Sequence, residues 1–448
     1  MTTPNGPVLF NSSTGSDTAA SGLGPATALS GAGASTTAAS GVVTGIVTTG
    51  VTSGDLLWVG STSGRRFSVI ASVDSGTQVT CDDVFVNTES SRNWGIGGKR
   101  KSIAGSAYNF DNAAIDFNGV EFIQFEDGYT ESTTARMRFR SPTNYSSPLT
   151  LRTEPNAAVN ARFTSNYTSD PFVFGSSQTN IYERLEFEQT NPAGSCAASG
   201  SGAGTFKYCK FGVGATKPTS AYQTSRPETF IGCEFYSAGP SCVSQTDEAS
   251  FIECLFNGGT TGMEVTGAGA TGFLVKGCIF EGQVDGILMN NGGGTLRQWK
   301  FFVDNIFNCT NSALRFTTGD SLRKVTIHFS GNIIANSTYG IEYPVGMTLY
   351  PPSLGVYRNN AFCNIGTSNY LNSYGGQVGD VSAGSDPFVD SANGDYSLNE
   401  TAGGGAVLRA AAHTVIQTTV HQYNQLTDGS GGGGGGATHY DPFTNPRF

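Results

Sequence analysis

One order of apolar and polar residues recurs along the middle of this chain. It reads aromatic, two variable residues, Cys or Asn, one variable residue and Phe, and its eight copies start 21 to 28 residues apart. A repeat of about 24 residues is typical of a solenoid, in which each repeat buries its apolar side only against its neighbours. The copies are Tyr182–Phe187, Phe206–Phe211, Phe230–Phe235, Phe251–Phe256, Val275–Phe280, Phe302–Phe307, Phe329–Ile334 and Tyr357–Phe362.

Each copy places apolar residues on both sides of the Cys or Asn position. Phe251 lies three residues before Cys254, and Phe256 lies two residues after it. Side chains alternate between the faces of a straight strand, so both phenylalanines point inward only if the chain bends between them. We therefore predict a tight turn at this position, where Asn tolerates a left-handed backbone. The column reads Leu185, Cys209, Cys233, Cys254, Cys278, Asn305, Asn332 and Asn360.

A second column, of mostly small residues, lies eight positions further on and precedes a short alternating strand. Each repeat then has three short strands, which predicts an all-β fold: a single-stranded parallel β-helix. Eight repeats would extend for about 38 Å at the usual strand spacing. Each buried phenylalanine would contribute roughly 1.5–3 kcal/mol. The small column is Ser241, Gly262, Gly286, Ala313, Gly340 and Ser368, and the predicted aromatic file is Phe211, Phe235, Phe256, Phe280 and Phe307.

The composition agrees with strands and tight turns. Charged residues make up 13% of the chain, Gly numbers 61, and the net charge is −10. A nucleic-acid partner would need a basic face, and Lys99–Lys101 is the one basic cluster. No apolar stretch approaches the roughly 18 residues of a membrane span. Residues 1–5 do not read as a secretory signal.

The cysteines do not suggest a disulfide framework. They number nine, which is odd, and four of them occupy the turn column. We expect small buried thiols in a chain that folds in a reducing cytoplasm. The column has no CxxC pair and no His alongside, so a metal site is not expected.

These features resemble the right-handed parallel β-helix family of pectate-lyase-like architecture. The Asn column stands where that family carries its asparagine ladder, between the second and third sheets. Residues from Thr14–Asp17 to Thr27 are similar to an opening segment of bacterial surface and phage β-helix proteins, and Asp386–Asp390 with Asn393–Leu398 to a closing one. The resemblance implies the fold but no single activity, because lyases, hydrolases, tail spikes and adhesins share it.

The catalytic motifs of the pectinolytic members are not found. The best candidates for a catalytic group are Glu264, Arg315 and Glu342. They lie on the outward side of the strand that follows the column of small residues. Glu264 and Arg315 would lie two repeats apart, about 10 Å. A solvated polar strand face is the alternative that we favour. No resident cofactor is expected, and Ca²⁺ beside a carboxylate is the one ion considered.

The repeat is confined to the centre, which predicts four parts. Residues 1–105 would form an N-terminal β module with strands at Gly54–Val59, Arg66–Ala71 and Gln78–Thr80, with Trp94 at its junction to the solenoid. The β-helix would span residues 106–375, and a C-terminal cap region, with a helix or cap at Leu408–Leu426, would span 376–428. Residues 429–448 would be a glycine linker and a tail that docks on a neighbouring subunit through Tyr440, Phe443, Arg447 and Phe448.

Three functions remain open at this point. The first is a structural, self-associating protein: a fibre, tail or decoration protein of a phage virion, or a subunit of a surface filament. Such a protein would assemble as a homo-oligomer, and trimers are common among the tail spikes that share this architecture. The second is a polysaccharide lyase or glycosidase of the same fold. The third is an adhesin that binds cell-surface glycans without chemistry. We favour the first, at a virion or extracellular surface, because charge is sparse and no catalytic group stands out.

Overall fold

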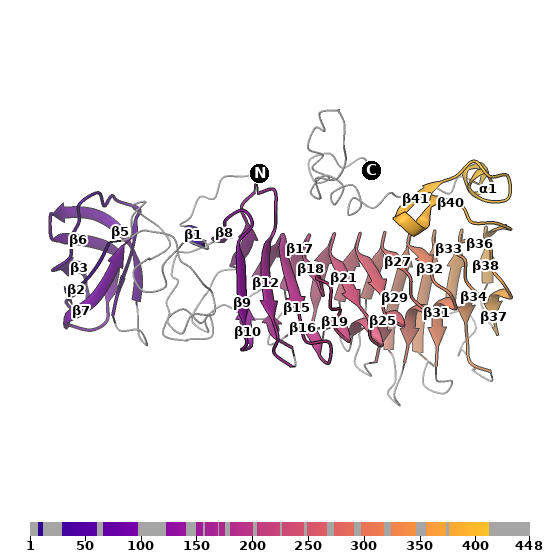
Figure 1. Cartoon of the computed structure of the whole chain (residues 1–448), viewed down its shortest axis with the longest axis horizontal. Helices are drawn as coiled ribbons and strands as arrows, with labels where there is room; N and C mark the ends of the chain where they lie inside the picture. The colour runs from indigo at the N-terminus through magenta and orange to yellow at the C-terminus, as the bar shows by residue number, and fades with distance from the viewer. Residues whose placement is uncertain are drawn as a thin grey trace.

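A computed structural model gives the structure of the chain. It describes residues 8–11, 29–60, 66–96, 122–139, 149–155, 157–168, 170–174, 180–199, 204–224, 226–245, 249–266, 273–290, 297–317, 324–345, 355–372 and 376–411. Three parallel sheets run side by side along a rod, with a small β-barrel at its N-terminal end (Figure 1). The predicted parallel β-helix is confirmed. The predictions for Lys99–Lys101, for the opening segment from Thr14 to Thr27 and for the tail concern residues outside the described ranges.

Successive turns of the coil contribute one strand to each sheet. The first sheet contains β1 (Val8–Asn11), β8 (Phe122–Phe125), β11 (Thr150–Thr153), β14 (Asn180–Glu183), β17 (Gly204–Lys207), β20 (Glu228–Ile231), β23 (Ala249–Ile252), β26 (Phe273–Lys276), β29 (Arg297–Val303), β32 (Lys324–Ser330), β35 (Gly355–Arg358) and β38 (Gly376–Val378). The second contains β9 (Thr130–Thr133), β12 (Ala161–Ser165), β15 (Leu185–Gln189), β18 (Lys210–Phe211), β21 (Glu234–Ser237), β24 (Leu255–Gly258), β27 (Ile279–Glu281), β30 (Ile306–Asn308), β33 (Ile333–Ala335), β36 (Ala361–Cys363) and β39 (Val381–Ala383). The third contains β10 (Met137–Phe139), β13 (Phe172–Phe174), β16 (Ser195–Ser199), β19 (Ser220–Thr224), β22 (Ser241–Gln245), β25 (Thr261–Val265), β28 (Asp285–Met289), β31 (Ser312–Phe316), β34 (Tyr339–Glu342) and β37 (Ser368–Leu371). β1, β38 and β39 lie outside the 106–375 range expected for the solenoid and still pair with its sheets.

The predicted aromatic file fills the interior of the rod. Phe235 and Phe256 stack with ring centroids 5.1 Å apart, and Phe256 and Phe280 stack at 4.5 Å with an angle of 2° between their planes. The file extends at both ends, to Phe211 at 5.3 Å and to Phe307 at 4.7 Å. All five rings are fully buried. This in-register pairing makes each turn bury its apolar side against its neighbours, as the repeat predicted.

The asparagine ladder forms at the C-terminal half of the rod. Asn305 donates from its backbone N–H and from Nδ2 to Oδ1 of Asn332, at 3.0 and 2.9 Å. Asn332 makes the same two bonds to Asn360, both at 3.1 Å. Each amide also donates back to a carbonyl of the preceding turn, as from Asn332 to Phe302 at 3.0 Å. Asp380 ends the ladder by accepting from the N–H of Asn360 at 2.8 Å.

The four cysteines of the turn column continue the row of ladder asparagines toward the N-terminus. Each thiol donates to a carbonyl of the preceding turn, as from Cys278 to Phe251 at 3.5 Å. Cys278 also donates its N–H to Oδ1 of Asn305 at 2.9 Å, which joins the two halves of the file. Burial raises the pKa of the Cys233 and Cys278 thiols well above the ordinary value. They lie in the core as small buried side chains, as the sequence analysis expected.

The left-handed residue of the turn stands one position earlier than predicted. It precedes the Cys or Asn, as at Tyr208, Glu253 and Asp304 with φ near +55° and at Gly277 and Gly331 with φ of +65° and +68°. Larger residues and glycines alternate here for a steric reason. A Cβ on Gly331 would lie 2.3 Å from Oδ1 of Asp304 in the turn before. Asn is therefore selected for its hydrogen bonds, and the residue before it adopts the left-handed backbone conformation.

The N-terminal module is a closed antiparallel barrel with strand order β2-β3-β6-β5-β4-β7. The predicted strands appear in β4, β5 and β6, but β2 and β3 arise in the run of small residues that the sequence analysis left unassigned. That run contains required glycines: Gly45 has φ +75°, and a Cβ there would lie 2.3 Å from the Gly33 carbonyl oxygen. The strands are β2 (Leu29–Thr36), β3 (Ser40–Thr44), β4 (Leu56–Val59), β5 (Arg66–Ser75), β6 (Gln78–Phe85) and β7 (Glu89–Ile96).

Trp94 does not seal the junction between barrel and rod, contrary to our expectation. Its ring lies in the core of the barrel. Trp58 instead belongs to the same buried cluster as Ile123 and Phe125 in the first turns of the rod. The sequence could not separate these two roles because both tryptophans lie in strands of the same barrel.

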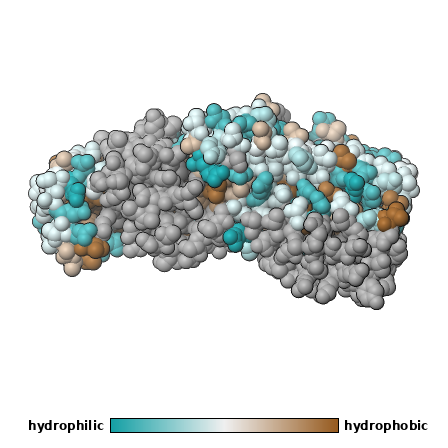
Figure 2. Space-filling view, turned by 90° about the horizontal axis from the view of Figure 1, so that it is seen from below, coloured by the Kyte–Doolittle hydropathy of each residue, from teal (hydrophilic) through white to brown (hydrophobic). Residues whose placement is uncertain are grey.

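The C-terminal segment covers the side of the rod. It comprises β40 (Phe388–Asp390), η1 (Ser391–Asn393), β41 (Asp395–Leu398) and α1 (Gly405–Ala410). Figure 1 shows the segment above the strands of the second sheet. Phe388, Tyr396 and Leu408 form one buried cluster with outward residues of that sheet, among them Ile306 and Ile333. In the view from below, exposed hydrophobic residues form small separate groups, one on the barrel and one at the C-terminal end of the rod (Figure 2).

We expect Asn332→Ala to destabilise the rod strongly. The substitution leaves the buried N–H of Asn305 and the carbonyl of Phe302 without their partners, and each such loss costs about 1–3 kcal/mol. Asn257→Ala is the matched control, because Asn257 makes one half-exposed bond to Glu281 at 3.1 Å. Urea unfolding should show a loss on the order of 3 kcal/mol for the first variant and less than about 1 kcal/mol for the control. Equal losses would contradict the role of the ladder.

Candidate functional site

The three predicted site residues share one outward column of the third sheet. Register places Glu264 beside Leu288, Leu288 beside Arg315, and Arg315 beside Glu342. Strand pairing therefore brings the predicted residues to one surface. It joins only two of them directly, because Leu288 separates Glu264 from Arg315.

Arg315 is the centre of this surface. Its Nη1 lies 3.0 Å from Oδ2 of Asp285, and its Nε lies 3.5 Å from Oε2 of Glu342. The hydrogen bond to Asp285 raises the pKa of Arg315 above its already high ordinary value. Asp285 is buried and also accepts from Asn311 and Ser312, both at 2.8 Å. We call Asp285, Asn311, Ser312, Arg315 and Glu342 the Arg315 cluster.

Glu264 lies apart from that cluster. Its Oε1 accepts from Nδ2 of Asn290 at 2.9 Å. Sequence reasoning missed Asp285 because it looked only at the outward column. Register places Asp285 beside Thr261 and Ser312, at the first position of its strand. The sequence signal that could have revealed Asp285 is an acidic residue at a position that hydroxyl side chains occupy in the neighbouring turns.

A second charged group, which sequence reasoning did not find, lies on the second sheet. Residues of alternating sign follow one another in one outward column: Arg162, Glu186, Lys210 and Glu234. The Nζ of Lys210 lies 3.8 Å from carboxylate oxygens of both Glu186 and Glu234. Nε of Arg162 lies 3.6 Å from Glu186. We call these four residues the charge column.

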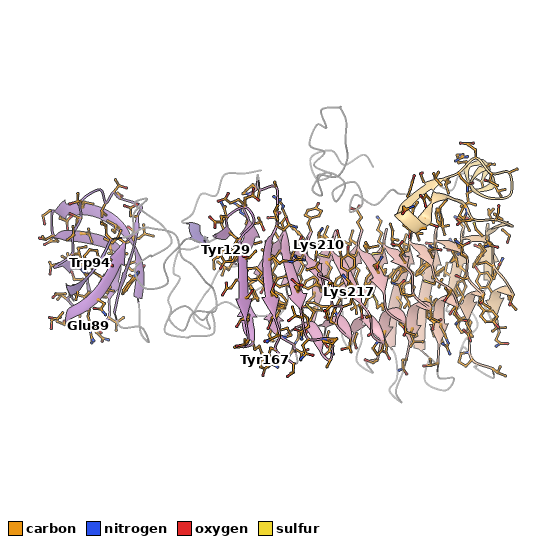
Figure 3. The ribbon with its side chains drawn as sticks, viewed as in Figure 1. Glu89, Trp94, Tyr129, Tyr167, Lys210 and Lys217 are labelled. Atoms are coloured by element: carbon orange, nitrogen blue, oxygen red, sulfur yellow. The ribbon has the colours of Figure 1, made fainter. Side chains whose placement is uncertain are left out.

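Further polar side chains surround the charge column. Nζ of Lys217 lies 4.6 Å from the ring centroid of Tyr236, and Figure 3 labels both Lys210 and Lys217 on this part of the rod. The Tyr236 hydroxyl donates to Glu234 at 2.5 Å. Burial raises the pKa of Glu186 above its ordinary value, and burial lowers the pKa of Lys217. Both shifts reflect partial exclusion of water from charged groups.

The column stays charged only as far as Glu234. Beyond it, the same column continues as Leu255, Ile279, Ile306 and Ile333, which are buried. The C-terminal segment packs in the same cluster as these apolar residues. The sequence therefore assigns one half of this sheet face to the chain's own C-terminal segment and leaves the other half polar.

Glu228 is one of the carboxyl groups that lie inside the rod. Glu228 points inward at the start of β20 and is 4% exposed. Its Oε1 accepts from the Tyr222 hydroxyl at 2.8 Å, and among the described residues its Oε2 has no hydrogen-bond partner. Burial raises the pKa of Glu228 to about 8. A substrate on the outer faces cannot reach this group, so we do not include it in a site.

Within the described ranges, no group of three His, Cys, Asp or Glu side chains could hold a metal ion. No helix of the described part of the chain is long and apolar enough to cross a membrane. His328, the histidine of the solenoid, lies on the outer face of the first sheet beside Phe301, with ring centroids 5.6 Å apart.

The fold defines the chain as a single-stranded parallel β-helix with a barrel at one end. No family model and no curated protein matches it. Among solved structures it is similar to the tailspike protein gp49 from Pseudomonas phage LKA1, with 12% identity, 81% of this chain and 62% of that chain covered, and a TM-score of 0.25. It is also similar to the catalytic domain of a GH87 α-1,3-glucanase in complex with nigerose, with 10% identity, 81% and 89% covered and a TM-score of 0.29.

A third similar structure is the Gp54 tailspike of Acinetobacter baumannii bacteriophage AP22 in complex with A. baumannii capsular saccharide. It has 11% identity and a TM-score of 0.22, with 77% of this chain and 64% of that chain covered. The chain thus spans a little under two thirds of the length of either tailspike. At these identities and TM-scores the likeness says nothing about function, so the proposals below rest on the geometry of this chain.

We expect Glu228→Gln to remove a pH dependence of stability. The folded-state pKa of about 8 exceeds the ordinary value of 4.5, so the folded chain holds a proton that the unfolded chain releases between these values. Stability is then fully present below pH 4.5 and falls as pH rises toward 8, by up to about 1.4 kcal/mol per pH unit. Gln keeps the bond to Tyr222 and does not titrate.

Urea unfolding at pH 5, 6.5 and 8 measures this slope. The wild-type chain should lose stability across the series more steeply than the Glu228→Gln variant. Glu264→Gln is the control, because Glu264 is half-exposed, and it should follow the wild type. Parallel curves for the wild type and Glu228→Gln would show that Glu228 is not held protonated.

Proposed function

We propose that the chain is a structural, self-associating β-helix protein: a fibre, tail or decoration protein of a phage virion, or a subunit of a surface filament. One observation carries the proposal. In both outward clusters the carboxylates are held by cations of the same chain, Glu342 and Asp285 by Arg315, and Glu186 and Glu234 by Lys210. These clusters therefore serve to fix neighbouring turns.

Glycosidases need different electrostatics from these clusters. Their two carboxyl groups flank the scissile bond about 5 to 9.5 Å apart, and one must be protonated. In the Arg315 cluster the guanidinium contacts both carboxylates, with Nη1 3.0 Å from Asp285 and Nε 3.5 Å from Glu342. A cation between two carboxylates occupies the space where a sugar oxygen would have to sit. The arrangement therefore supports a structural role better than acid–base chemistry.

The tail completes this proposal. Residues 429–448 follow the described part of the chain and carry Tyr440, Phe443, Arg447 and Phe448 after a glycine run. A segment with two prolines and three aromatics has too few residues for a core of its own. We place its partner on a neighbouring copy of the chain, in a homo-oligomer at a virion or extracellular surface.

A second candidate function is binding of a cell-surface glycan by the charge column. The observation that favours it is the looseness of the contacts: Lys210 lies 3.8 Å from both glutamates, beyond hydrogen-bond distance. Asn160 beside them is buried, donates to Glu186 at 3.5 Å, and has no partner for Oδ1 among the described residues. Contacts of this length are commonly bridged by water, which sugar hydroxyls can replace.

We expect the purified full chain to associate. Light scattering after size-exclusion chromatography should give a mass that is a multiple of 46.7 kDa. Negative-stain images should show regular trimers or filaments. Removal of residues 429–448 should shift the mass toward the monomer. A monomer at every accessible concentration would refute the structural proposal.

We expect the glycan candidate to show itself in titration calorimetry with a panel of bacterial polysaccharides. Tyr236→Ala and Lys210→Met remove the ring and the ammonium of the site, and each should weaken binding about tenfold or more. Tyr339→Ala, on the third sheet, is the control and should bind as the wild type does. Equal binding by all variants would place the glycan elsewhere, and absence of binding across the panel would remove this candidate.

A further inference from the structure

The charged side chains of the charge column and the glutamate beside it pair with one another. Nε of Arg162 lies 3.6 Å from Glu186 and 3.5 Å from Glu188. Nζ of Lys210 lies 3.8 Å from Glu234. Each glutamate of this part of the second sheet therefore has a cation of the same chain beside it.

Lys217 differs from these cations because it has no counter-ion among the described residues. No carboxylate of the described ranges lies within ion-pair distance of its Nζ, and its side chain makes no hydrogen bond to them. Its ammonium lies instead over an aromatic ring, with Nζ 4.6 Å from the centroid of Tyr236; Figure 3 labels Lys217. A ring face attracts a cation but carries no net charge. The positive charge of Lys217 is therefore oriented without being compensated.

The turn that carries Lys217 is fixed against the sheet. It joins β18 to β19 and contains Gly212 and Gly214, with φ of +75° and +95°. A Cβ on Gly214 would overlap the carboxylate of Glu188, so only glycine lets the backbone lie this close. Pro218, which follows Lys217, is buried and has a restricted φ. The local sequence thus holds Lys217 in one place on the surface.

The surroundings of Lys217 make its uncompensated charge costly. The side chain is half-buried, and burial lowers the pKa of its ammonium because water solvates the charged form less well. Glu188 is the carboxylate that acts on Lys217 at longer range. It is already held by Arg162 and accepts from the Thr164 hydroxyl at 3.3 Å. An anionic group of a ligand would supply the missing partner through a charge-assisted hydrogen bond.

A second pair of a cation and a tyrosine lies at the same corner of the rod, where turns lead from the second sheet to the third. The guanidinium carbon of Arg136 lies 5.5 Å from the ring centroid of Tyr167. Arg136 is exposed, and Tyr167 is half-buried. Tyr167 follows β12 and Tyr236 lies in β21, three turns further on, which is about 14 Å along the rod. A polymer that runs along this corner can contact both pairs, whereas a small anion can contact one.

The Arg315 cluster does not offer the same chemistry. Arg315 lies within ion-pair distance of two carboxylates, those of Asp285 and Glu342. A further anion there would meet the acidic groups that already hold the guanidinium. Lys217 has an aromatic neighbour in their place, so it is the better anion-binding group of the two.

We propose that Lys217 binds the anionic group of an acidic glycan at the corner between the second and third sheets. The inference rests on the glycan-binding candidate proposed above and names its class of ligand. Lysine binds carboxylate, sulfate and phosphate groups alike, as a compact point charge. The chain carries a net charge of −10, so a polyanion is not drawn to the molecule as a whole. Binding therefore has to come from a local group such as Lys217.

The test compares each acidic polysaccharide of the bacterial panel with its carboxyl-reduced form, in which every carboxylate has become an alcohol. Dextran sulfate and neutral dextran are the matched probes for a sulfate group. All are titrated calorimetrically into the full-length chain at about 0.15 M salt. At least one acidic polymer should bind about tenfold or more tightly than its uncharged counterpart.

Variants of the full-length chain assign this preference to one side chain. Lys217→Met removes the charge and keeps the apolar stem, so it should weaken binding of the acidic polymer about tenfold and leave the uncharged form unaffected. Lys217→Arg keeps a cation and should bind nearly as the wild type does. Lys207→Met is the matched control, because Lys207 is a half-buried lysine on the outer face of the first sheet. Far-UV circular dichroism and the melting temperature establish that each variant is folded.

The outcomes separate this inference from the glycan-binding candidate. Equal affinity for acidic and uncharged polymers, or a folded Lys217→Met variant that binds as the wild type does, overturns the inference and leaves glycan binding intact. Equal weakening by Lys207→Met also overturns it. Binding of dextran sulfate alone, lost in Lys217→Met, supports it and identifies the anion as a sulfate. A chain that binds no polysaccharide refutes both. The comparison of charged and uncharged polymers uses the wild type, so it decides the question even if a variant does not fold.

Discussion

Stacking of identical turns at one strand spacing is the constraint on which this structure depends. Each turn pairs its backbone with the turns before and after it, so a residue meets the residue of the same column about 4.8 Å away. Columns rather than single positions therefore decide stability. Inward columns must hold side chains that stack on themselves, as Phe256 and Phe280 do, or that bond to themselves, as Asn305 and Asn332 do.

The same constraint shapes the outer surface. A column of like charges would repel along the rod, and the charge column instead alternates in sign from Arg162 to Glu234. An apolar column must be covered or must associate. The chain covers the one on its second sheet with Phe388 and Tyr396. The carboxylates that resembled a site in the sequence, such as Glu342, are held by Arg315 across neighbouring turns.

Periodicity predicted the solenoid because the repeated residues are large and recur at a nearly constant spacing. The columns can therefore be read directly from the aligned copies. The same reasoning missed β2 and β3, where small residues such as Gly33 and Gly45 are chosen for backbone contact and leave no hydrophobic period. It also misplaced the left-handed residue by one, since Asp304 and Gly331 share no chemistry that a sequence displays. Asp285 escaped notice because its partner Arg315 stands 30 residues later. The charge column depends on register, which only the pairing of strands reveals.

The energetic coupling between phenylalanines of neighbouring turns tests the stacking of the aromatic column most directly. A double-mutant cycle with Phe256→Leu and Phe280→Leu should show a coupling of about 0.5–1.5 kcal/mol in the free energy of unfolding, because these rings stack face to face. The same cycle on Phe211 and Phe280, which lie three turns apart, should be additive within about 0.5 kcal/mol. Equal coupling in the two cycles, or none in the first, would contradict the in-register stacking of turns.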